Sequence, residues 1–297
     1  MSSIYTLQTD IENLLKTKGW MTESLQKELG EGVASRIKTQ FETEKAPSLR
    51  LSKMGPVCPR ALWYSINRPE EAEPVQPWAQ QKFSFGHFWE TYALVLTKAA
   101  GHKVEGEQHV CELDGIKGHL DAIVDGCVVD YKSCSARQFT KFKSGNFEMD
   151  DLFGYLDQLD GYSMANRENP LVVVHDRAFL VAVHRDMGHV HVYEHRVRSG
   201  SIRPRIEEYK SVVNRSEPPG CLCETKEDGH QGNRILGTKA SYSPQKWTCF
   251  PSLRCFLFKN GPMYVSSLVR KPYGYLREVD RYGNEVHPER QVHTDWN

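Results

Sequence analysis

The sequence predicts an α/β fold, because segments with helical periodicity alternate with segments that are typical of strands. Apolar residues follow helical spacing in four stretches, at 4–45, 83–100, 150–166 and 202–213. Strand-like apolar runs lie between them, at 103–111, 118–133, 171–174, 179–183 and 190–193. The 297 residues are enough for one large domain or two smaller ones.

The stretch 118–133 is the most informative part of the chain. It predicts two strands joined by a tight turn at Asp125-Gly126, a dipeptide that favours hairpin turns. Side chains alternate along a strand, so Asp130 and Lys132 project to the same face, which Asp121 can reach from the partner strand. A buried carboxylate pair beside one lysine is costly unless a cation completes it.

This pattern suits the hydrolysis of phosphodiester bonds. Carboxylates bind hard divalent ions such as magnesium through oxygen. Such an ion activates water and neutralises phosphate charge, and Lys132 can orient the water or stabilise the developing charge. An isolated D-x-K tripeptide often occurs by chance, however. An ordinary hairpin whose Asp130 and Lys132 pair in solvent therefore remains an alternative at this point.

Composition is typical of a soluble globular protein. Lys plus Arg and Asp plus Glu both number 38, and a net charge of zero neither supports nor excludes a local basic groove. No apolar run approaches membrane-spanning length and no signal-peptide pattern is present, so we expect a cytoplasmic protein. In a reducing cytoplasm, clustered cysteines indicate metal binding more than disulfides. The cysteines are Cys58, Cys111, Cys127, Cys134, Cys221, Cys223, Cys249 and Cys255.

Two predicted helices carry further candidates. Glu90 lies among bulky apolar residues of the helix at 83–100, and it points either into a site or to solvent on the polar face. Gln158 and Tyr162 share one side of the helix at 150–166, together with Tyr155. These side chains bind phosphate, orient a catalytic group, or form a half-polar packing face.

These motifs together resemble the PD-(D/E)XK nuclease superfamily, in particular its RecB-like branch. That branch includes CRISPR-adaptation nucleases, bacterial recombination nucleases and many phage exonucleases. The resemblance covers roughly 55–260, and the four motifs occur in the family's order. They are Gly86-His87-Phe88-Trp89-Glu90 for G-x-x-x-H, Gly118-His119-Leu120-Asp121 for G-x-x-D, Asp130-Tyr131-Lys132 for (D/E)-x-K and Gln158 to Tyr162 for Q-x-x-x-Y. Glu90 stands at the usual histidine position, as in lambda-exonuclease-like members.

The resemblance implies a restriction-endonuclease-like fold, with a mixed central sheet flanked by helices. It also implies a metal-dependent DNA exonuclease that acts on single strands or duplex ends in recombination, repair or phage DNA processing. A bacterial or phage-infected host cytoplasm and a helicase, recombinase or integrase partner fit this class. The implied Mg²⁺ or Mn²⁺ ligands are Glu90, Asp121, Asp130 and the backbone of Val129 or Tyr131. The resemblance also implies that Lys132 positions water and that Gln158 and Tyr162 hold the lysine or the phosphate.

The cysteines extend the resemblance, since iron–sulfur members of this branch place one cysteine before the first motif and three after the last. Cys58 matches the first, and Cys249 and Cys255 match the closing pair. Either Cys221 or Cys223 can supply the remaining thiolate of a [4Fe–4S] cluster. The four C-terminal cysteines can instead form a local zinc site without Cys58. We expect Cys111, Cys127 and Cys134, which lie in or beside predicted strands, to be buried structural thiols.

The expected organisation has three parts: a helical segment at 1–54 for packing or partner contact, a nuclease core at 55–216, and a cysteine-rich segment at 217–297. Interleaved basic and aromatic residues at 256–297 either stack on single-stranded bases or belong to a surface hairpin that turns at Gly283-Asn284. A DNA-binding or recombination partner that keeps the fold without useful cleavage is the competing function. A structural zinc protein with a fortuitous D-x-K is a third.

Overall fold

The structure is a computed structural model in which the chain divides into two compact units. One unit comprises Met1–Pro56 and Glu70–Lys210, and the other comprises Val57–Pro69 and Ser211–Asn297. The three-part division expected from the sequence stays a prediction. The described residues are 3–43, 46–71, 75, 77–145, 147–151, 153–220, 223–228, 237–242, 247–248, 264–265, 274–275 and 277–278.

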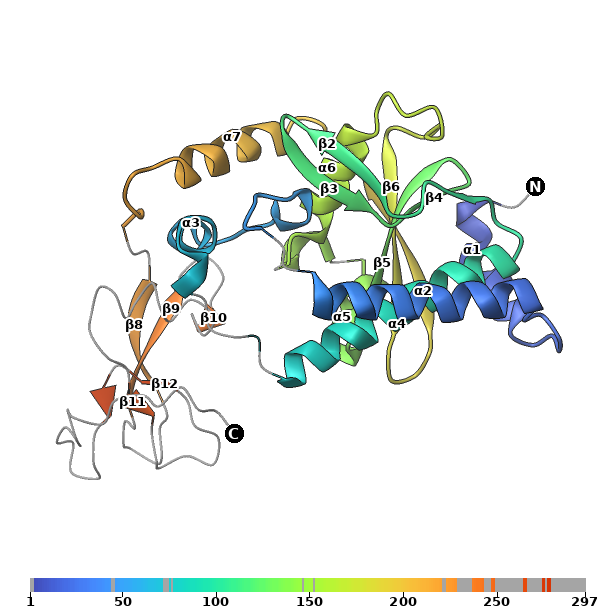
Figure 1. The fold of residues 1–297 in the computed structure, drawn as a ribbon, viewed down its shortest axis with the longest axis horizontal. Coiled ribbons are helices and arrows are strands. Elements are labelled where there is room, and N and C mark those ends of the chain that lie inside the picture. The colour runs from blue at the N-terminus through green and yellow to red at the C-terminus, as the bar shows by residue number, and fades with distance from the viewer. Residues whose placement is uncertain are drawn as a thin grey trace. The chain divides into compact units, whose positions relative to one another are not determined.

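A mixed five-stranded sheet forms the centre of the first unit, with the strand order β1-β4-β5-β6-β7. Strands β5 and β6 are parallel, and every other neighbouring pair in this sheet is antiparallel. The predicted α/β fold with a mixed sheet is therefore confirmed. The strands are β1 (Val104–Glu105), β4 (Ala122–Val124), β5 (Cys127–Cys134), β6 (Arg177–His184) and β7 (Val190–Arg196) (Figure 1).

The predicted hairpin is present, with Ala122 opposite Val129 across β4 and β5. Asp125 and Gly126 have φ angles of 50° and 79°, as a tight turn with two left-handed residues requires. The strand before the turn is interrupted at Asp121, however. Its first part is β3 (Ile116–Leu120), which pairs with β2 (His109–Leu113) in a separate two-stranded sheet. Asp121 therefore lies where the chain passes from one sheet to the other.

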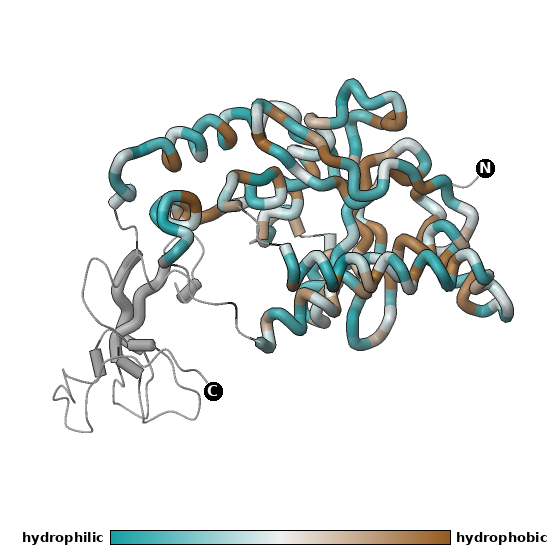
Figure 2. Tube along the Cα trace, viewed as in Figure 1, coloured by the Kyte–Doolittle hydropathy of each residue, from teal (hydrophilic) through white to brown (hydrophobic). Residues whose placement is uncertain are grey.

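One face of the central sheet packs against helices from the N-terminal half of this unit. Buried residues of α1 (Leu7–Leu14) and α4 (Pro77–Ala99) share a core with β5 and β6. Helix α2 (Glu23–Glu42) packs against α4 and buries none of its own residues completely. Figure 2 accordingly shows many hydrophilic residues along α2. Burial of this apolar surface is the main favourable contribution to the fold.

Helices α5 (Ala136–Lys143) and α6 (Tyr155–Ala165) cover the opposite face. Successive side chains of β5 alternate between faces, and Val129 and Tyr131 belong to the core beneath α1 and α4. Asp130 and Lys132 must then face α6, where Gln158 contacts Asp130. Helix α7 (Ile202–Val213) has the bounds that the sequence predicts. The 3₁₀ helices are η1 (Ile4–Thr6), η2 (Leu51–Lys53), η3 (Pro69–Glu71) and η4 (Phe147–Asp150).

Two predicted strands differ from the structure. The run 171–174 is a loop, because the Val173 and Val174 N–H groups donate to the Gly126 carbonyl and wrap this segment around the hairpin turn. The run 103–111 is divided between β1 and β2 by a turn in which Gln108 has a φ angle of 52°. Apolar composition identified these segments, but hydrogen bonding to distant residues decided their conformation.

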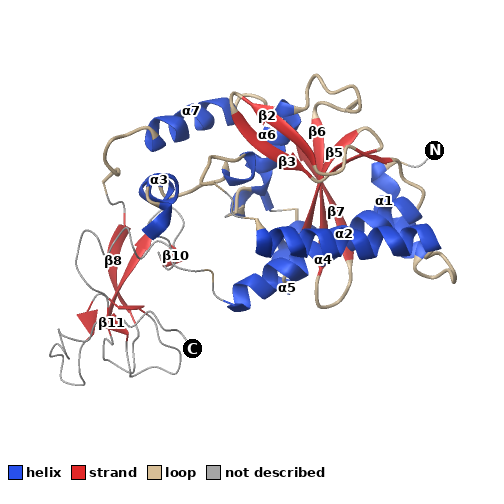
Figure 3. Cartoon of the chain, viewed as in Figure 1, coloured by secondary structure: helices blue, strands red, loops and turns tan. Residues whose placement is uncertain are grey.

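The second unit contains α3 (Pro59–Asn67), which begins directly after Cys58. The Trp63 Nε1–H donates to the Arg215 carbonyl at 2.9 Å, which ties α3 to the chain that follows α7. Figure 3 shows the strands of this unit. They are β8 (Cys223–Asp228), β9 (Gly237–Tyr242), β10 (Trp247–Thr248), β11 (Tyr264–Val265), β12 (Gly274–Tyr275) and β13 (Arg277–Glu278).

Two sheets are described in this unit. Strand β9 pairs with β8, β10 and β13, and β11 pairs with β12, all antiparallel. The turn expected at Gly283-Asn284 lies outside the described residues. Among the helices described, none has the length and apolar character needed to cross a membrane.

Candidate functional site

The structure brings residues of the four sequence motifs close together around β5, with Gln158 and Tyr162 on its α6 side. Asp130 is almost completely buried, and its Oδ1 accepts a hydrogen bond from Gln158 Nε2 at 3.0 Å. The same amide donates to the Tyr162 hydroxyl at 2.9 Å. Lys132 Nζ lies 2.6 Å from Asp130 Oδ2 and 5.5 Å from the centre of the Tyr155 ring. Gln158 thus contacts the Asp130 carboxylate, and Tyr162 contacts Gln158, so these side chains do not form only a packing face.

The glycine of the second motif has a steric role at this place. A Cβ added at Gly118 would lie 2.6 Å from Cε1 of Tyr162 and 3.0 Å from the Leu51 side chain. Because both neighbours are buried, neither could move aside easily. Gly118 therefore lets Tyr162 of α6 lie directly against β3, within reach of Gln158.

Asp121 and Glu90 form the other half of the site. The Tyr131 N–H donates to Asp121 Oδ2 at 2.8 Å, which fixes Asp121 to the neighbouring strand. Gln108 Nε2 donates to Asp121 Oδ1 at 3.3 Å and to Glu90 Oε1 at 3.2 Å. Arg36 Nη1 of α2 lies 2.7 Å from the same Glu90 oxygen. Glu90 therefore points into the site and not to solvent.

Burial and mutual repulsion perturb the carboxylates in different directions. Desolvation, together with the charge of Asp121, raises the pKa of Glu90 well above its ordinary value, and Arg36 only partly opposes this. Desolvation also raises the pKa of Asp130 to about 7, against the attraction of Lys132. Glu90 and Asp130 thus resist ionisation. This is expected where buried carboxylates outnumber the positively charged side chains beside them.

Asp121 and Lys132 are shifted toward their charged forms. Desolvation opposes ionisation of Asp121, but Lys132 and the Tyr131 N–H outweigh it and lower the pKa of Asp121. Desolvation likewise opposes protonation of Lys132, and the charges of Asp130 and Asp121 outweigh it and raise the pKa of Lys132. Lys132 therefore stays an ammonium ion beside the two carboxylates.

We refer to Glu90, Asp121, Asp130, Arg36 and Lys132 as the site cluster. Its fully ionised form carries three negative and two positive charges, which leaves one negative charge uncompensated. Asp130 Oδ2 is buried and forms an ion pair with Lys132 Nζ at 2.6 Å. Buried carboxylate oxygens and an uncompensated negative charge fit a divalent cation, whose preferred ligands are oxygens.

The ligand arrangement is incomplete in the side-chain positions observed. Within the described part of the chain, no group of three or more His, Cys, Asp or Glu residues is arranged to hold a metal ion. Arg36 and Gln108 account for this, because they hold Glu90 and Asp121 by the oxygens that a metal would use. The oxygen ligands thus suit a metal ion chemically. Glu90 must separate from Arg36 before its carboxylate can bind that ion.

Sequence reasoning missed Arg36 and Gln108. The N-terminal segment was interpreted as packing or partner contact, yet its Arg36 contacts a predicted metal ligand. Its place on α2 gives no sign of this, because a single arginine on a polar helix face is ordinary. Gln108 reaches the site because a positive φ angle redirects the chain between β1 and β2.

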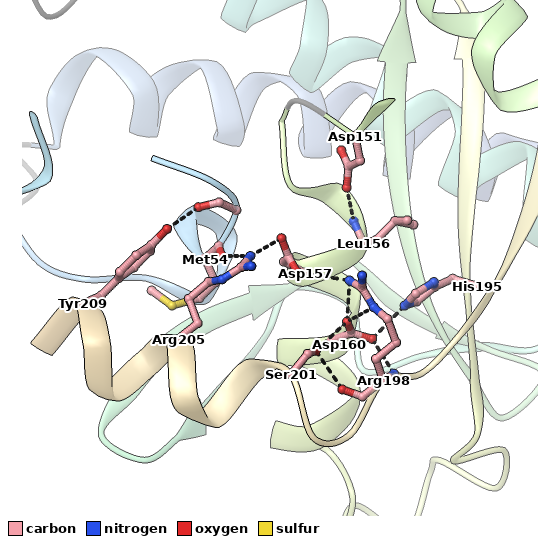
Figure 4. Close-up of polar contacts among 11 residues, drawn as sticks. Met54, Asp151, Leu156, Asp157, Asp160, His195, Arg198, Ser201, Arg205 and Tyr209 are labelled. Atoms are coloured by element: carbon pink, nitrogen blue, oxygen red, sulfur yellow. Dashed lines mark hydrogen bonds and ion pairs between the residues drawn. The ribbon is translucent and has the colours of Figure 1, made fainter. Parts of the chain in front are cut away.

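A second buried group of charges lies on α6 and its neighbours, shown in Figure 4. Asp160 Oδ1 is 2.7 Å from His195 Nε2 and accepts the Arg198 N–H at 2.9 Å, while Asp160 Oδ2 accepts from Arg198 Nε at 2.8 Å. Asp157 pairs with Arg198 at 3.0 Å and with Arg205 of α7. We call Asp157, Asp160, His195, Arg198 and Arg205 the anchor cluster. Because Asp157 and Asp160 flank Gln158 in sequence, this cluster holds the helix that presents Gln158 to the site.

The cysteines fall into two groups. Cys111, Cys127 and Cys134 are buried thiols, as predicted. Burial raises the pKa of Cys127 to about 11 and that of Cys134 to about 12, so both stay protonated at neutral pH. Cys58 is buried in the second unit, the unit that also contains the C-terminal cysteines. Cys223 begins β8, with its side chain not described, and Cys221, Cys249 and Cys255 lie outside the described residues.

Comparisons with known proteins give little guidance. No family model matches the chain, and no curated protein matches it. A solved structure titled "Crystal structure of SSO0001" aligns with 65% of this chain and 89% of that chain, at 13% identity and a TM-score of 0.35. That likeness is too low to inform the function, so the proposals below rest on the motifs and the site geometry.

Proposed function

We propose that this chain is a Mg²⁺- or Mn²⁺-dependent DNA exonuclease with a restriction-endonuclease-like fold, of the RecB-like branch of the PD-(D/E)XK superfamily. The observation that carries the proposal is the convergence of Asp121, Asp130 and Lys132 with the Gln158 amide in one buried site that holds more carboxylates than cations. Residues that only stabilise a fold would be expected to balance their charges, and these do not.

Each residue has a role that follows from its contacts. Asp121, Asp130 and Glu90 would supply carboxylate oxygens to the metal, with the Tyr131 carbonyl as a further ligand. When bound, the divalent ion would activate a water molecule and neutralise charge on the phosphate. Lys132 stays protonated, so its ammonium group can hold the attacking water or stabilise the charge that develops on the phosphate.

Gln158 and Tyr162 act on Asp130. The Gln158 amide fixes one Asp130 oxygen and leaves the other toward Lys132. Tyr162 receives the second amide hydrogen bond, and burial raises the pKa of its hydroxyl, so it remains a neutral partner. This arrangement restricts the rotation of the carboxylate, which is the kind of preorganisation that catalysis requires.

The competing function is a DNA-binding or recombination partner that keeps the nuclease fold without useful cleavage. The ion pair between Arg36 and Glu90 favours it, since a permanent pair would prevent Glu90 from binding a metal. The intact Asp121, Asp130 and Lys132 favour the enzyme. A helicase, recombinase or integrase partner is compatible with either function.

Digestion of end-labelled linear DNA beside a closed circle, with Mg²⁺ and separately with Mn²⁺, tests the proposal. We expect metal-dependent release of nucleotides from the linear DNA, and no cleavage by Asp130→Asn. Asp176→Asn is a matched control, because Asp176 is an exposed aspartate directly before β6. DNA binding without cleavage in either metal would favour the partner function instead.

We also propose a [4Fe–4S] cluster held by Cys58, Cys249, Cys255 and one of Cys221 and Cys223. The grouping of Val57–Pro69 with Ser211–Asn297 supports it, because Cys58 then shares a compact unit with the other four cysteines. Protein purified without oxygen should be brown and contain about four irons. Cys58→Ser should lose the colour while Cys111→Ser keeps it. Colourless protein with one zinc, indifferent to Cys58→Ser, would indicate the local zinc site.

A further inference from the structure

A groove with a volume of about 770 Å³ lies beside the site cluster in the first unit. Val33 and Ile37 of α2 line it on one side, and aromatic residues of α4 line it on the other. We call it the α2–α4 groove. The two helices lie side by side (Figure 1).

The aromatic side chains of this groove are unusually accessible. Phe85 is 57% exposed and stacks on no other ring among the described residues. Phe88 is 38% exposed and stacks on Tyr92 with ring centroids 5.9 Å apart, which leaves one of its faces available. Clustered exposed apolar surface of this kind marks a binding site more often than it stabilises a fold.

The charged residues of the lining indicate an anionic ligand. Lys82 and Arg185 contribute two positive charges, and Asp186 contributes one negative charge. Neither Lys82 nor Arg185 forms an ion pair with another residue in the described ranges, so both charges are available. Lys82 Nζ also lies 4.6 Å from the centre of the Trp78 ring. Aromatic faces flanked by free cations are typical of surfaces that bind single-stranded nucleic acid.

The groove adjoins the candidate site along α2. Val33 of the lining lies three residues before Arg36, so the two side chains are neighbours on one face of this helix, and Arg36 contacts Glu90 of the site cluster. A strand whose phosphate lies at the site cluster would therefore have its adjoining nucleotides next to the groove. A protein helix docked there would gain nothing from this continuity.

We propose that the α2–α4 groove holds the bases of an unpaired DNA strand next to the scissile phosphate, with Phe85 as a stacking platform and Lys82 and Arg185 as phosphate contacts. This inference rests on the proposed function and adds a base-binding site to it. Bases within a duplex are already stacked on each other and offer Phe85 no free face, so the groove distinguishes unpaired from paired strands. Stacking tolerates any base, and so we expect no sequence preference.

Binding without cleavage tests the groove. Fluorescence anisotropy of a labelled oligothymidine, and of a blunt duplex, is measured with the full chain in EDTA, where a metal-dependent nuclease is inactive. Phe85→Ala should weaken binding of the single strand about 10-fold, the effect of losing one base–aromatic stack, and leave duplex binding unchanged. Lys82→Ala should also weaken single-strand binding and reduce its salt dependence.

Phe83→Ala is the matched control, since Phe83 is 52% exposed on the same helix but does not line the groove. It should bind the single strand as the unmodified chain does. Equal binding by Phe85→Ala and Phe83→Ala would overturn the proposal, as would an equal loss of duplex binding. Concentration-dependent self-association that Phe85→Ala abolishes, without single-strand binding, would assign the groove to a second copy of the chain and also overturn it.

Failure of the groove and failure of the nuclease are separable. If Asp130→Asn abolishes cleavage but Phe85→Ala binds normally, only the groove is wrong. If no DNA is cleaved in Mg²⁺ or Mn²⁺, but single-strand binding depends on Phe85, the groove stands and the partner function replaces the nuclease.

Discussion

The site cluster and the anchor cluster are both groups of buried acids in the first unit, and α6 connects them, yet their charges are balanced differently. The anchor cluster pairs Asp157 and Asp160 with Arg198 and Arg205, and His195 completes the contacts of Asp160. The site cluster sets three carboxylates against only Arg36 and Lys132. Two neighbouring groups of similar composition therefore differ by one unit of negative charge.

The pKa values follow this difference. In the anchor cluster, burial opposes ionisation of Asp160, but His195 and Arg198 outweigh it and lower the pKa of Asp160. In the site cluster, burial and like charge raise the pKa values of Glu90 and Asp130. Buried charges that balance each other are typical of a structural role. A buried carboxylate without a compensating positive charge favours the binding of a cation. We infer that the anchor cluster is structural and that the site cluster is functional.

The largest effect should come from removing a site carboxylate or the lysine. Asp121→Ala or Lys132→Ala should reduce cleavage by at least about 10²–10³-fold, equivalent to about 2.7–4 kcal/mol, because each removes a charge that acts in the transition state. The variants should remain folded, with melting temperatures close to that of the unmodified chain. End-labelled DNA digestion and circular dichroism measure the two effects. Undiminished cleavage by either purified variant would remove that residue from the mechanism.

The matching change in the anchor cluster should affect stability more than chemistry. Asp160→Asn should lower the free energy of unfolding by about 2–3 kcal/mol, because it leaves His195 and Arg198 without their charged partner. This estimate is below that for a fully buried ion pair, since the Arg198 side chain is 47% exposed. Urea denaturation measures the loss. Asp130→Asn should show no comparable loss. Equal losses in both variants would contradict the inference that only the anchor cluster is structural.

Opposite shifts in metal requirement should distinguish the two partners of the Arg36–Glu90 ion pair. Glu90→Gln should raise the metal concentration needed for half-maximal cleavage about 10-fold, as expected when a ligand or its partner is lost. Arg36→Gln should lower it, because Glu90 no longer has to leave a cation before it binds the metal. Titration of activity with Mn²⁺ checks both directions. A wild-type metal requirement in Glu90→Gln would return Glu90 to a structural role.

The smallest expected effect is a difference in acid stability. The folded-state pKa of Asp160 lies below the ordinary value of 3.8, so its stabilising contribution is fully present above that value and is lost as pH falls through the lowered pKa. The stability of the unmodified chain should therefore decline more steeply below about pH 4 than that of Asp160→Asn. Thermal unfolding from pH 6 to pH 3 measures the slopes, and parallel curves would show that Asp160 does not carry this linkage.

Local sequence signals predicted most of the scaffold. Asp125-Gly126 fixed the hairpin because few other dipeptides favour two successive left-handed residues. Helix α7 has the predicted bounds because its apolar residues follow helical spacing from Ile202 to Val213. Alternation on β5 also placed Asp130 and Lys132 on one face, and the structure shows them in contact.

The remainder depended on contacts between distant parts of the chain. The ion pair of Arg36 with Glu90 joins two helices whose pairing no local pattern specifies. The break at Asp121, where the chain leaves one sheet for another, likewise arises from the pairing of β3 with β2. The anchor cluster combines residues of α6, β7 and α7, and none of its members stood out in the sequence.

Calorimetric titration of Mn²⁺ into the unmodified chain, Asp130→Asn and Asp160→Asn tests the central claim most directly. All three are measured at a temperature where circular dichroism shows each to be folded. The charge deficit of the site cluster predicts that the unmodified chain and Asp160→Asn bind Mn²⁺, whereas Asp130→Asn loses this binding. Absence of Mn²⁺ binding to the unmodified chain, or its loss in Asp160→Asn and retention in Asp130→Asn, would contradict the account.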